Sequence, residues 1–167
     1  MELKEIGEGR IFQGNKFSVT SRWVEHYNKW GIPSLGYRVD SEDGSVAISG
    51  DTNYCQAMVD LANNVDVLIH ECTFPDEIIK QRDMKSHSGP TTAGKVAQEA
   101  GAKKLILTHL GPYTSQEKAV EMASMYYYHW IGPEIWSKLV RDVAKHYDGP
   151  ILLGQDAMTV EIQPAQK

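Results

Sequence analysis

Several carboxylate and imidazole side chains stand at the ends of apolar runs that are typical of buried strands. Asp51, Glu71 and His109 each end such a run, His26 follows an earlier stretch of β type, and His87 lies in a polar loop. Buried strands deliver their last side chains to a sheet edge, where binding sites are commonly built. Imidazoles and a carboxylate that can bridge two cations about 3.5–4 Å apart are the donors of dinuclear zinc hydrolases. The sequence therefore predicts one site at one rim of a sheet, the alternative being that each side chain only meets solvent at a strand end.

The apolar patterns predict an antiparallel β meander followed by alternating strands and helices. The expected strands of the meander cover residues 10–13, 17–24, 35–39 and 46–49. After Asp51 the pattern turns helical, with Asn53 as the expected cap of a helix that reaches residue 62. The later elements are expected as strands at 67–71 and 104–109, helices at 77–84, 91–100, 115–129 and 134–147, and a closing pair of strands at 151–153 and 158–162. This order predicts a single α/β layer, in which helices cover one side of the sheet.

Length and composition fit one domain over residues 1–167. The net charge of −5 gives no overall basic field for a nucleic acid. No apolar run approaches the roughly 18 residues that a membrane span needs, so no membrane partner is expected. Cys55 and Cys72 lack metal-type spacing, and we expect them to be reduced thiols in the core of a cytoplasmic protein.

The order of short motifs resembles one known family. The motifs are Glu25-His26, Pro33-Ser-Leu-Gly-Tyr-Arg38, Ser49-Gly-Asp-Thr52, Leu68-Ile-His-Glu-Cys-Thr-Phe74, Ser86-His-Ser88 and Leu107-Thr-His109. Together they are similar to the later part of metallo-β-lactamase-fold hydrolases, in the branch of ribonuclease Z and the arylsulfatase-like enzymes. The resemblance covers nearly the whole chain. It implies an α/β fold that is half of an αββα metallo-β-lactamase sandwich, with a mixed sheet and helices on one face.

The resemblance also implies roles for the side chains at the predicted rim. His26 would be a ligand of a first zinc, Asp51 the bridging carboxylate and His109 a ligand of a second zinc, with manganese or iron as alternative metals. His87 would protonate the leaving group, and Glu71 would orient it. A carboxylate behind an imidazole raises its basicity and fixes its tautomer, although Glu71 could instead be a strand-end acid paired with a lysine.

Two departures from the family pattern limit this expectation. The His-x-His-x-Asp-His motif that supplies most of the family's metal ligands is absent. What remains is one histidine per metal and the shared Asp51, whereas a zinc site takes about three or four protein ligands, so the lone chain should bind metal weakly or not at all. Half of the sandwich is missing too, which would leave one apolar sheet face uncovered. An upstream segment, a separate polypeptide or a second copy of the chain could cover it.

The leading hypothesis is a metal-dependent hydrolase that in its complete form cleaves phosphodiester or sulfate-ester bonds in a small substrate. RNA is not favoured, because the net charge is acidic and Leu110-Gly-Pro-Tyr-Thr114 lacks the arginine that ribonuclease Z relatives carry after the last histidine. The alternative, from a different class, is a non-catalytic half-fold that acts as a dimerisation or interaction subunit.

Overall fold

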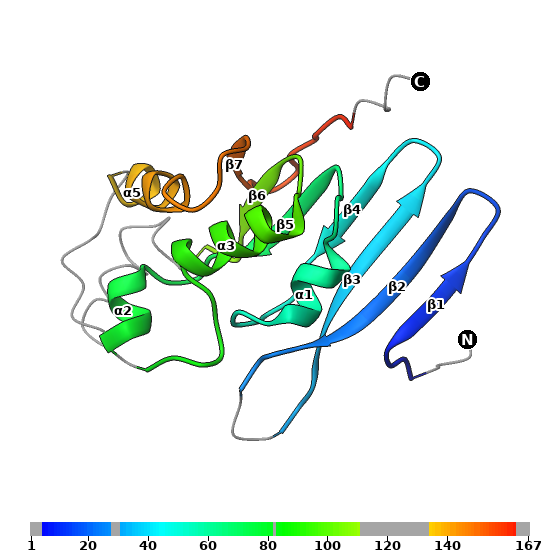
Figure 1. Ribbon diagram of the computed structural model, residues 1–167, viewed down its shortest axis with the longest axis horizontal. Coiled ribbons are helices and arrows are strands. Elements are labelled where there is room, and N and C mark those ends of the chain that lie inside the picture. The colour runs from blue at the N-terminus through cyan, green and yellow to red at the C-terminus, as the bar shows by residue number, and fades with distance from the viewer. Residues whose placement is uncertain (1–4, 28–30, 82, 111–133, 163–167) are drawn as a thin grey trace.

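The computed structural model describes residues 5–27, 31–81, 83–110 and 134–162. Its strands are β1 (Gly9–Gln13), β2 (Phe17–Val24), β3 (Ser34–Ser41), β4 (Ser45–Ile48), β5 (Val67–Glu71), β6 (Leu105–Thr108) and β7 (Ile151–Leu153). Its helices are α1 (Gln56–Leu61), α2 (Asp76–Gln81), α3 (Pro90–Ala100) and α5 (Glu134–Val143). Figure 1 shows one twisted sheet with the helices gathered on one side. The predicted helix at 115–129 lies outside the described residues.

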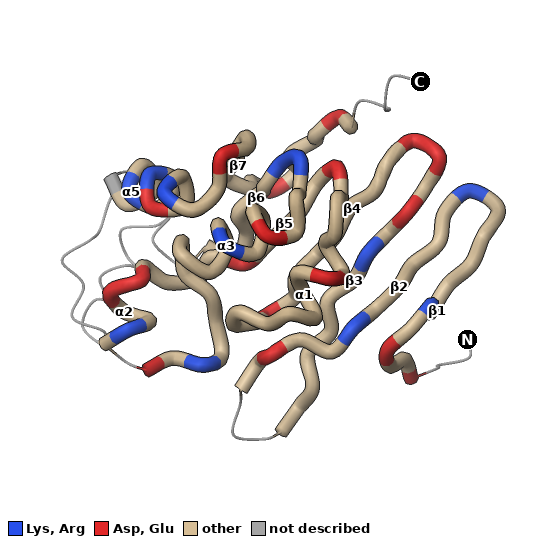
Figure 2. The backbone as a smooth tube through the Cα atoms, in the orientation of Figure 1, with Lys and Arg blue, Asp and Glu red and all other residues tan. Residues whose placement is uncertain are grey.

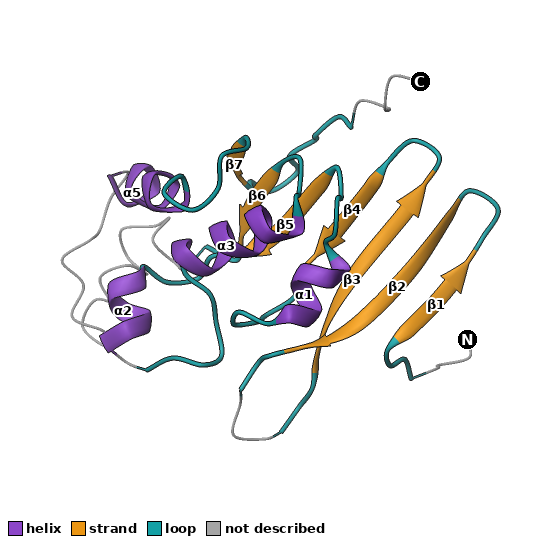
Figure 3. Ribbon diagram, viewed as in Figure 1, coloured by secondary structure: helices purple, strands orange, loops and turns teal. Residues whose placement is uncertain are grey.

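The sheet is mixed, and its strands lie side by side in the order in which they occur along the chain. Strands β1 to β4 pair antiparallel as a meander, whereas β4, β5, β6 and β7 pair parallel. A crossover between parallel strands is almost always right-handed. Because every crossover here moves the chain in the same direction across the sheet, right-handedness puts the connecting helices on the same face (Figure 3). The predicted α/β layer with helices on one side is confirmed.

The core lies between this helical layer and the sheet. Its fully buried side chains come from alternate strand positions and from the inner faces of the helices, and they include Met58, Leu68, Val96, Leu105, Leu107, Leu139 and Val143. Both cysteines are buried free thiols, as predicted. Helix α3 has the termini that its sequence predicts, with Pro90 in its first turn and Gly101 in the left-handed conformation at its end. None of the helices in the described ranges combines the length and apolar character needed to cross a membrane.

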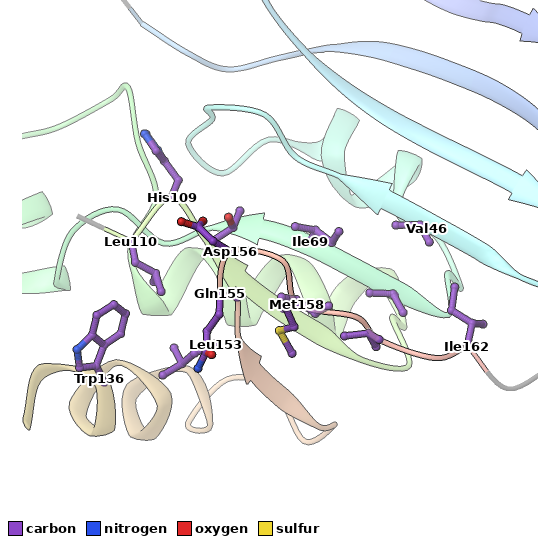
Figure 4. Close-up of a pocket in the computed structure, with 15 residues that line it drawn as sticks. Val46, Ile69, His109, Leu110, Trp136, Leu153, Gln155, Asp156, Met158 and Ile162 are labelled. Carbon is purple, nitrogen blue, oxygen red and sulfur yellow. The ribbon is translucent and has the colours of Figure 1, made fainter. Parts of the chain in front are cut away.

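Two details of the sequence prediction are wrong. Helix α1 begins at Gln56 with Cys55 at its cap position, because the Asn53 side chain instead accepts a hydrogen bond from the Tyr54 amide. The segment 158–162 is not a strand. It crosses the sheet face opposite the helices, and its Met158, Val160 and Ile162 line a groove on that face (Figure 4).

Candidate metal-binding and hydrolytic site

The ends of three parallel strands meet at one edge of the sheet. Strands β4, β5 and β6 are neighbours, so their carboxyl ends carry Asp51, Glu71 and His109 to the same edge. Gly50 makes the turn before Asp51 with φ of +62°, and a Cβ there would lie 2.6 Å from the carbonyl oxygen of Leu35. Only glycine fits this position without strain.

His109 also has a left-handed backbone, with φ of +50°. This conformation costs a side chain such as histidine about 1–2 kcal/mol, and such strain often collects at functional sites. The turn at the end of β6 therefore holds the His109 imidazole in place at a local cost in stability.

Two further histidines reach the same edge from outside these strands. His26 follows β2, and His87 lies in the loop before α3; the amide of Tyr27 donates to the carbonyl of Lys85 and so ties the two segments together. The ring centroids of His26 and His87 are 5.2 Å apart, and those of His87 and His109 are 5.4 Å apart. The three imidazoles thus form a row along the edge.

A group of potential ligand atoms lies within this row. Asp51, Glu71, His87 and His109 each offer an atom within 4.8 Å of the others, and Asp51 Oδ1 is 3.4 Å from His109 Nδ1. His26 is not part of that group, although its ring is next to His87. Every site residue predicted from the sequence therefore lies at this edge. The donor types suit zinc, and the side chains of Asp51 and His109 are about half exposed, at 46% and 49%.

Glu71 differs from the other members because its carboxylate is buried and surrounded by donors. Oε1 accepts hydrogen bonds from the Thr52 amide at 2.6 Å and from His87 Nδ1 at 3.1 Å. Oε2 accepts from the Thr73 hydroxyl at 2.6 Å and from the Ser88 amide at 3.0 Å. Burial by itself would raise the pKa of Glu71, but the bonds from His87, Thr73 and Ser88 bring it below its usual value. Glu71 is thus an ionised carboxylate whose acceptor sites are all used within the protein.

His87 gains a proton affinity from this arrangement. Burial would lower its pKa, but the hydrogen bond and charge of Glu71, together with the charge of Asp51, raise the pKa above that of free histidine. Its Nδ1 donates to Glu71, so Nε2 is the nitrogen with which His87 can exchange a proton.

Sequence reasoning missed the polar side chains that surround Glu71. Thr52, Thr73 and Ser88 belong to the quoted motifs, but the sequence alone assigns them no role. Thr73 follows Glu71 by two positions, which in an extended chain puts both side chains on one side, so this contact could have been found. Ser88 could not have been found, since it binds through its main-chain amide and its hydroxyl binds the carbonyl of Thr52.

The two other histidines in the described part of the chain, His70 and His146, do not belong to this group of potential ligands. His70 is fully buried, its Nδ1 donates to the Glu71 carbonyl at 2.7 Å, and its Nε2 has no partner among the described residues. His146 Nε2 lies 3.2 Å from the Thr91 hydroxyl. His129 lies outside the described residues.

A groove of about 960 Å³, lined by both apolar and polar residues, runs along the sheet face opposite the helices and ends at the site. Val46, Ile69 and Ile106 form part of its floor, the segment 155–162 crosses it, and His109 and Leu110 lie at one end (Figure 4). Val67 and Ile106 are buried yet do not belong to the core under the helices. The groove is thus a second apolar surface, and it leads to a candidate metal ligand.

Comparison with known proteins gives consistent matches. A family model described as a β-lactamase superfamily domain matches residues 2–110. A protein named ribonuclease Z from Bacillus licheniformis is 33% identical over 72% of this chain and 54% of its own length. Among solved structures, the metallo-β-lactamase fold protein YhfI from Bacillus subtilis aligns with a TM-score of 0.66 at 21% identity, over 88% of this chain and 50% of that chain. The short form of human tRNase Z aligns with a TM-score of 0.62 at 23% identity, over 92% of this chain and 46% of that chain. The chain spans about half the length of the curated relatives it matches.

Proposed function

Because this chain belongs to the β-lactamase superfamily, we propose that it carries part of the active site of a metal-dependent hydrolase that cleaves phosphodiester bonds. The observation that carries the proposal is the meeting of Asp51 and His109 with the Glu71–His87 pair at one sheet edge. A metal-binding group beside an imidazole with a raised pKa supplies the two functions that ester hydrolysis needs, activation of water and protonation of the leaving group.

Asp51, His109 and His26 are the proposed metal ligands, with zinc as the proposed ion and manganese or iron as alternatives. When bound, the ion would provide the Lewis acidity that ionises water near neutral pH. Glu71 is not proposed as a ligand, because a metal would have to displace one of its four hydrogen bonds. These donors fit a divalent ion in kind, but they are fewer than two ions require.

His87 is the proposed general acid. Its Nδ1 donates to Glu71, and the hydrogen bond and charge of Glu71 raise the pKa of His87 and so stabilise its imidazolium form, from which Nε2 can give a proton to the leaving oxygen. Glu71 orients the His87 ring and stabilises its imidazolium form. Glu71 itself stays ionised, because its carboxylate accepts four hydrogen bonds.

The groove supports a proposal for the remaining ligands. Exposed apolar side chains gathered in one groove can mark an interface, and this groove ends at His109. We propose that the polypeptide that covers the groove also supplies the further metal ligands. An upstream half of the sandwich and a second copy of this chain are the candidates, and the mass of the metal-loaded species in sedimentation equilibrium distinguishes them.

The names of the relatives favour phosphodiester over sulfate-ester bonds, and RNA as the polymer that carries them. The sequence alone led away from RNA because of the net charge of −5, and charges of both signs are interspersed over the described elements (Figure 2). Cleavage would therefore depend on RNA contacts made by the covering polypeptide. The two buried free thiols agree with the proposed cytoplasmic location.

Metal content and turnover of a chromogenic phosphodiester test the proposal. Purified protein is loaded with zinc, desalted and analysed by mass spectrometry for metal, with and without a co-expressed N-terminal half of a relative. Asp51→Asn should lower the zinc content, whereas Asp43→Asn, at an exposed turn, should not. His87→Ala should retain the zinc but lose about 10²–10⁴-fold in turnover. Zinc far below one equivalent and no turnover in both preparations would refute the hydrolase and favour the interaction subunit.

A further inference from the structure

We infer that the Thr73 hydroxyl is a positioning group that fixes the tautomer of His109 and joins this imidazole to the Glu71–His87 pair. Thr73 is buried, and its Oγ1 lies 2.6 Å from Glu71 Oε2 and 2.8 Å from His109 Nδ1. One hydroxyl therefore contacts a carboxylate and an imidazole at once.

A count of protons determines the direction of both bonds. Glu71 is ionised and accepts from three other donors, so it has no proton to give to Thr73. The single hydroxyl proton of Thr73 must therefore go to Glu71. The Thr73 oxygen then offers only lone pairs to His109, so Nδ1 of His109 carries a hydrogen and Nε2 carries the free lone pair.

The second neighbour of His109 Nδ1 leads to the same tautomer. Asp51 Oδ1 lies 3.4 Å from this nitrogen, too far for a strong hydrogen bond, and it is also an acceptor. Both groups next to Nδ1 therefore favour a hydrogen there, and Thr73 makes the shorter contact.

The same arrangement recurs at the other two histidines of the row. His26 Nδ1 faces the Ser86 carbonyl at 2.5 Å, and His87 Nδ1 faces Glu71 at 3.1 Å. Because a carbonyl and a carboxylate can only accept, Nδ1 is the donor in both rings. All three imidazoles thus have Nδ1 engaged by the protein, and in His87 and His109 this leaves Nε2 as the nitrogen that can take a proton or a ligand.

The hydrogen bond at Nδ1 of His109 should strengthen metal binding at Nε2, an effect that rests on the proposed function. An acceptor behind an imidazole orients the ring and raises its basicity as a ligand, and loss of such a partner costs about 10–100-fold in metal affinity. The tautomer itself does not rest on the proposed function, since it follows from contacts within the metal-free protein.

The tautomer is measured on the metal-free protein with ¹⁵N-labelled histidine, at about pH 8.5, where an ordinary imidazole is neutral. Long-range ¹H–¹⁵N spectra report which ring nitrogen carries the hydrogen. We expect Nδ1–H for His109 in the wild type and in Thr73→Ser, and a shift toward Nε2–H, the form that free histidine prefers, in Thr73→Val. An Nε2–H tautomer in the wild type, or an unchanged tautomer in Thr73→Val, would overturn the inference.

Thr91 supplies a matched control. Its hydroxyl lies between a carboxylate and an imidazole in the same manner, 2.8 Å from Asp76 Oδ2 and 3.2 Å from His146 Nε2, outside the site. Thr91→Val should change the spectrum of His146 and leave His109 as in the wild type, whereas Thr73→Val should do the reverse. An unaltered His146 signal also shows that Thr73→Val is folded. Where that variant does not fold, the wild-type spectrum still decides, because the inference requires Nδ1–H on His109.

A zinc titration then separates this inference from the proposed function. Thr73→Val should bind zinc about 10–100-fold more weakly than the wild type, and Thr73→Ser should restore affinity. A changed tautomer with unchanged zinc affinity would overturn the positioning role. A wild-type protein with the expected tautomer but no zinc binding, either alone or with the co-expressed N-terminal half, would refute the metal site and leave the assignment of the His109 tautomer intact.

Discussion

The carboxylate of Glu71 is the most connected group of the site, and Glu71→Gln tests what it contributes. Glutamine has the same shape but replaces one oxygen by an amide nitrogen, which is a donor. Placed at the position of Oε2, this nitrogen would face the Ser88 amide, another donor, and would force the Thr73 hydroxyl to turn. The bond from Ser88 is lost, and those from Thr52 and His87 remain but are no longer made to a charged group.

The magnitude follows from these contacts. A lost hydrogen bond to a charged group costs about 1.5–3 kcal/mol, and the bonds that remain weaken when the acceptor becomes neutral. Removal of a buried charge offsets part of this cost. We therefore expect Glu71→Gln to lower the free energy of unfolding by about 3 kcal/mol, a large share of the roughly 5–15 kcal/mol of an ordinary domain.

Urea unfolding followed by far-UV circular dichroism measures this loss. Glu42→Gln, in the exposed turn between β3 and β4, removes the same charge at the surface and should change stability by no more than about 0.5 kcal/mol. An equal m-value for all variants is required for the comparison. A loss below about 1 kcal/mol in Glu71→Gln would refute the view that an ionised carboxylate with four donors stabilises this edge.

Three further predictions concern the stability of the fold that carries the site. Gly50→Ala should lose at least about 1–2 kcal/mol in urea unfolding and weaken zinc binding, because its Cβ would meet the Leu35 carbonyl. The pKa of Asp66 is lowered, chiefly by its hydrogen bond with Lys103, although burial acts in the opposite direction. The ionised Asp66 therefore stabilises the folded state at any pH above the ordinary carboxyl pKa, and this stabilisation is lost as the pH falls through the lower pKa of the folded state. Asp66→Asn should therefore be about 1–2 kcal/mol less stable than the wild type at pH 7, and thermal unfolding at decreasing pH below about 4 should show this difference shrink. Leu68→Ala, on the helix-covered face of β5, should lower the free energy of unfolding by about 2–5 kcal/mol. Ile69→Ala, on the groove face of the same strand, should lower it by about 1 kcal/mol or less as long as no partner covers the groove. Urea unfolding measures both losses.

Strand and helix order could be predicted from the sequence because apolar periodicity and turn residues agree at most positions. The segment 158–162, which was expected to be a strand, is an exception. Its alternation of Met158, Val160 and Ile162 correctly indicates one apolar side, which faces the groove. Periodicity reports which side of an extended segment is apolar, but it does not report whether the main chain pairs with a strand. Here the tail lies against side chains of the sheet instead of extending it.

The residue types of the site could be predicted as well, since strand ends bring such groups to one edge. The hydrogen-bond network around them could not. Glu71 depends on donors from Thr52 and Ser88, which are 19 and 17 positions away in the chain. Only the folded arrangement reveals that all acceptor sites of Glu71 are used by protein donors, which sets Glu71 apart from the other candidate ligands.

The order of the parallel strands explains why the candidate site and the groove lie next to each other. The parallel strands follow one another in a single direction, so their ends form a continuous edge for Asp51, Glu71 and His109, and the described helices of their crossovers lie on one face (Figure 3). The other face keeps its groove, and that groove ends at His109. Since the groove and the proposed ligand set share His109, a polypeptide placed on the groove, as proposed above, would bury the exposed apolar side chains of the strands and reach the proposed metal ligands together. Covering the face and completing the site should therefore be one event, with zinc affinity and association rising or falling together.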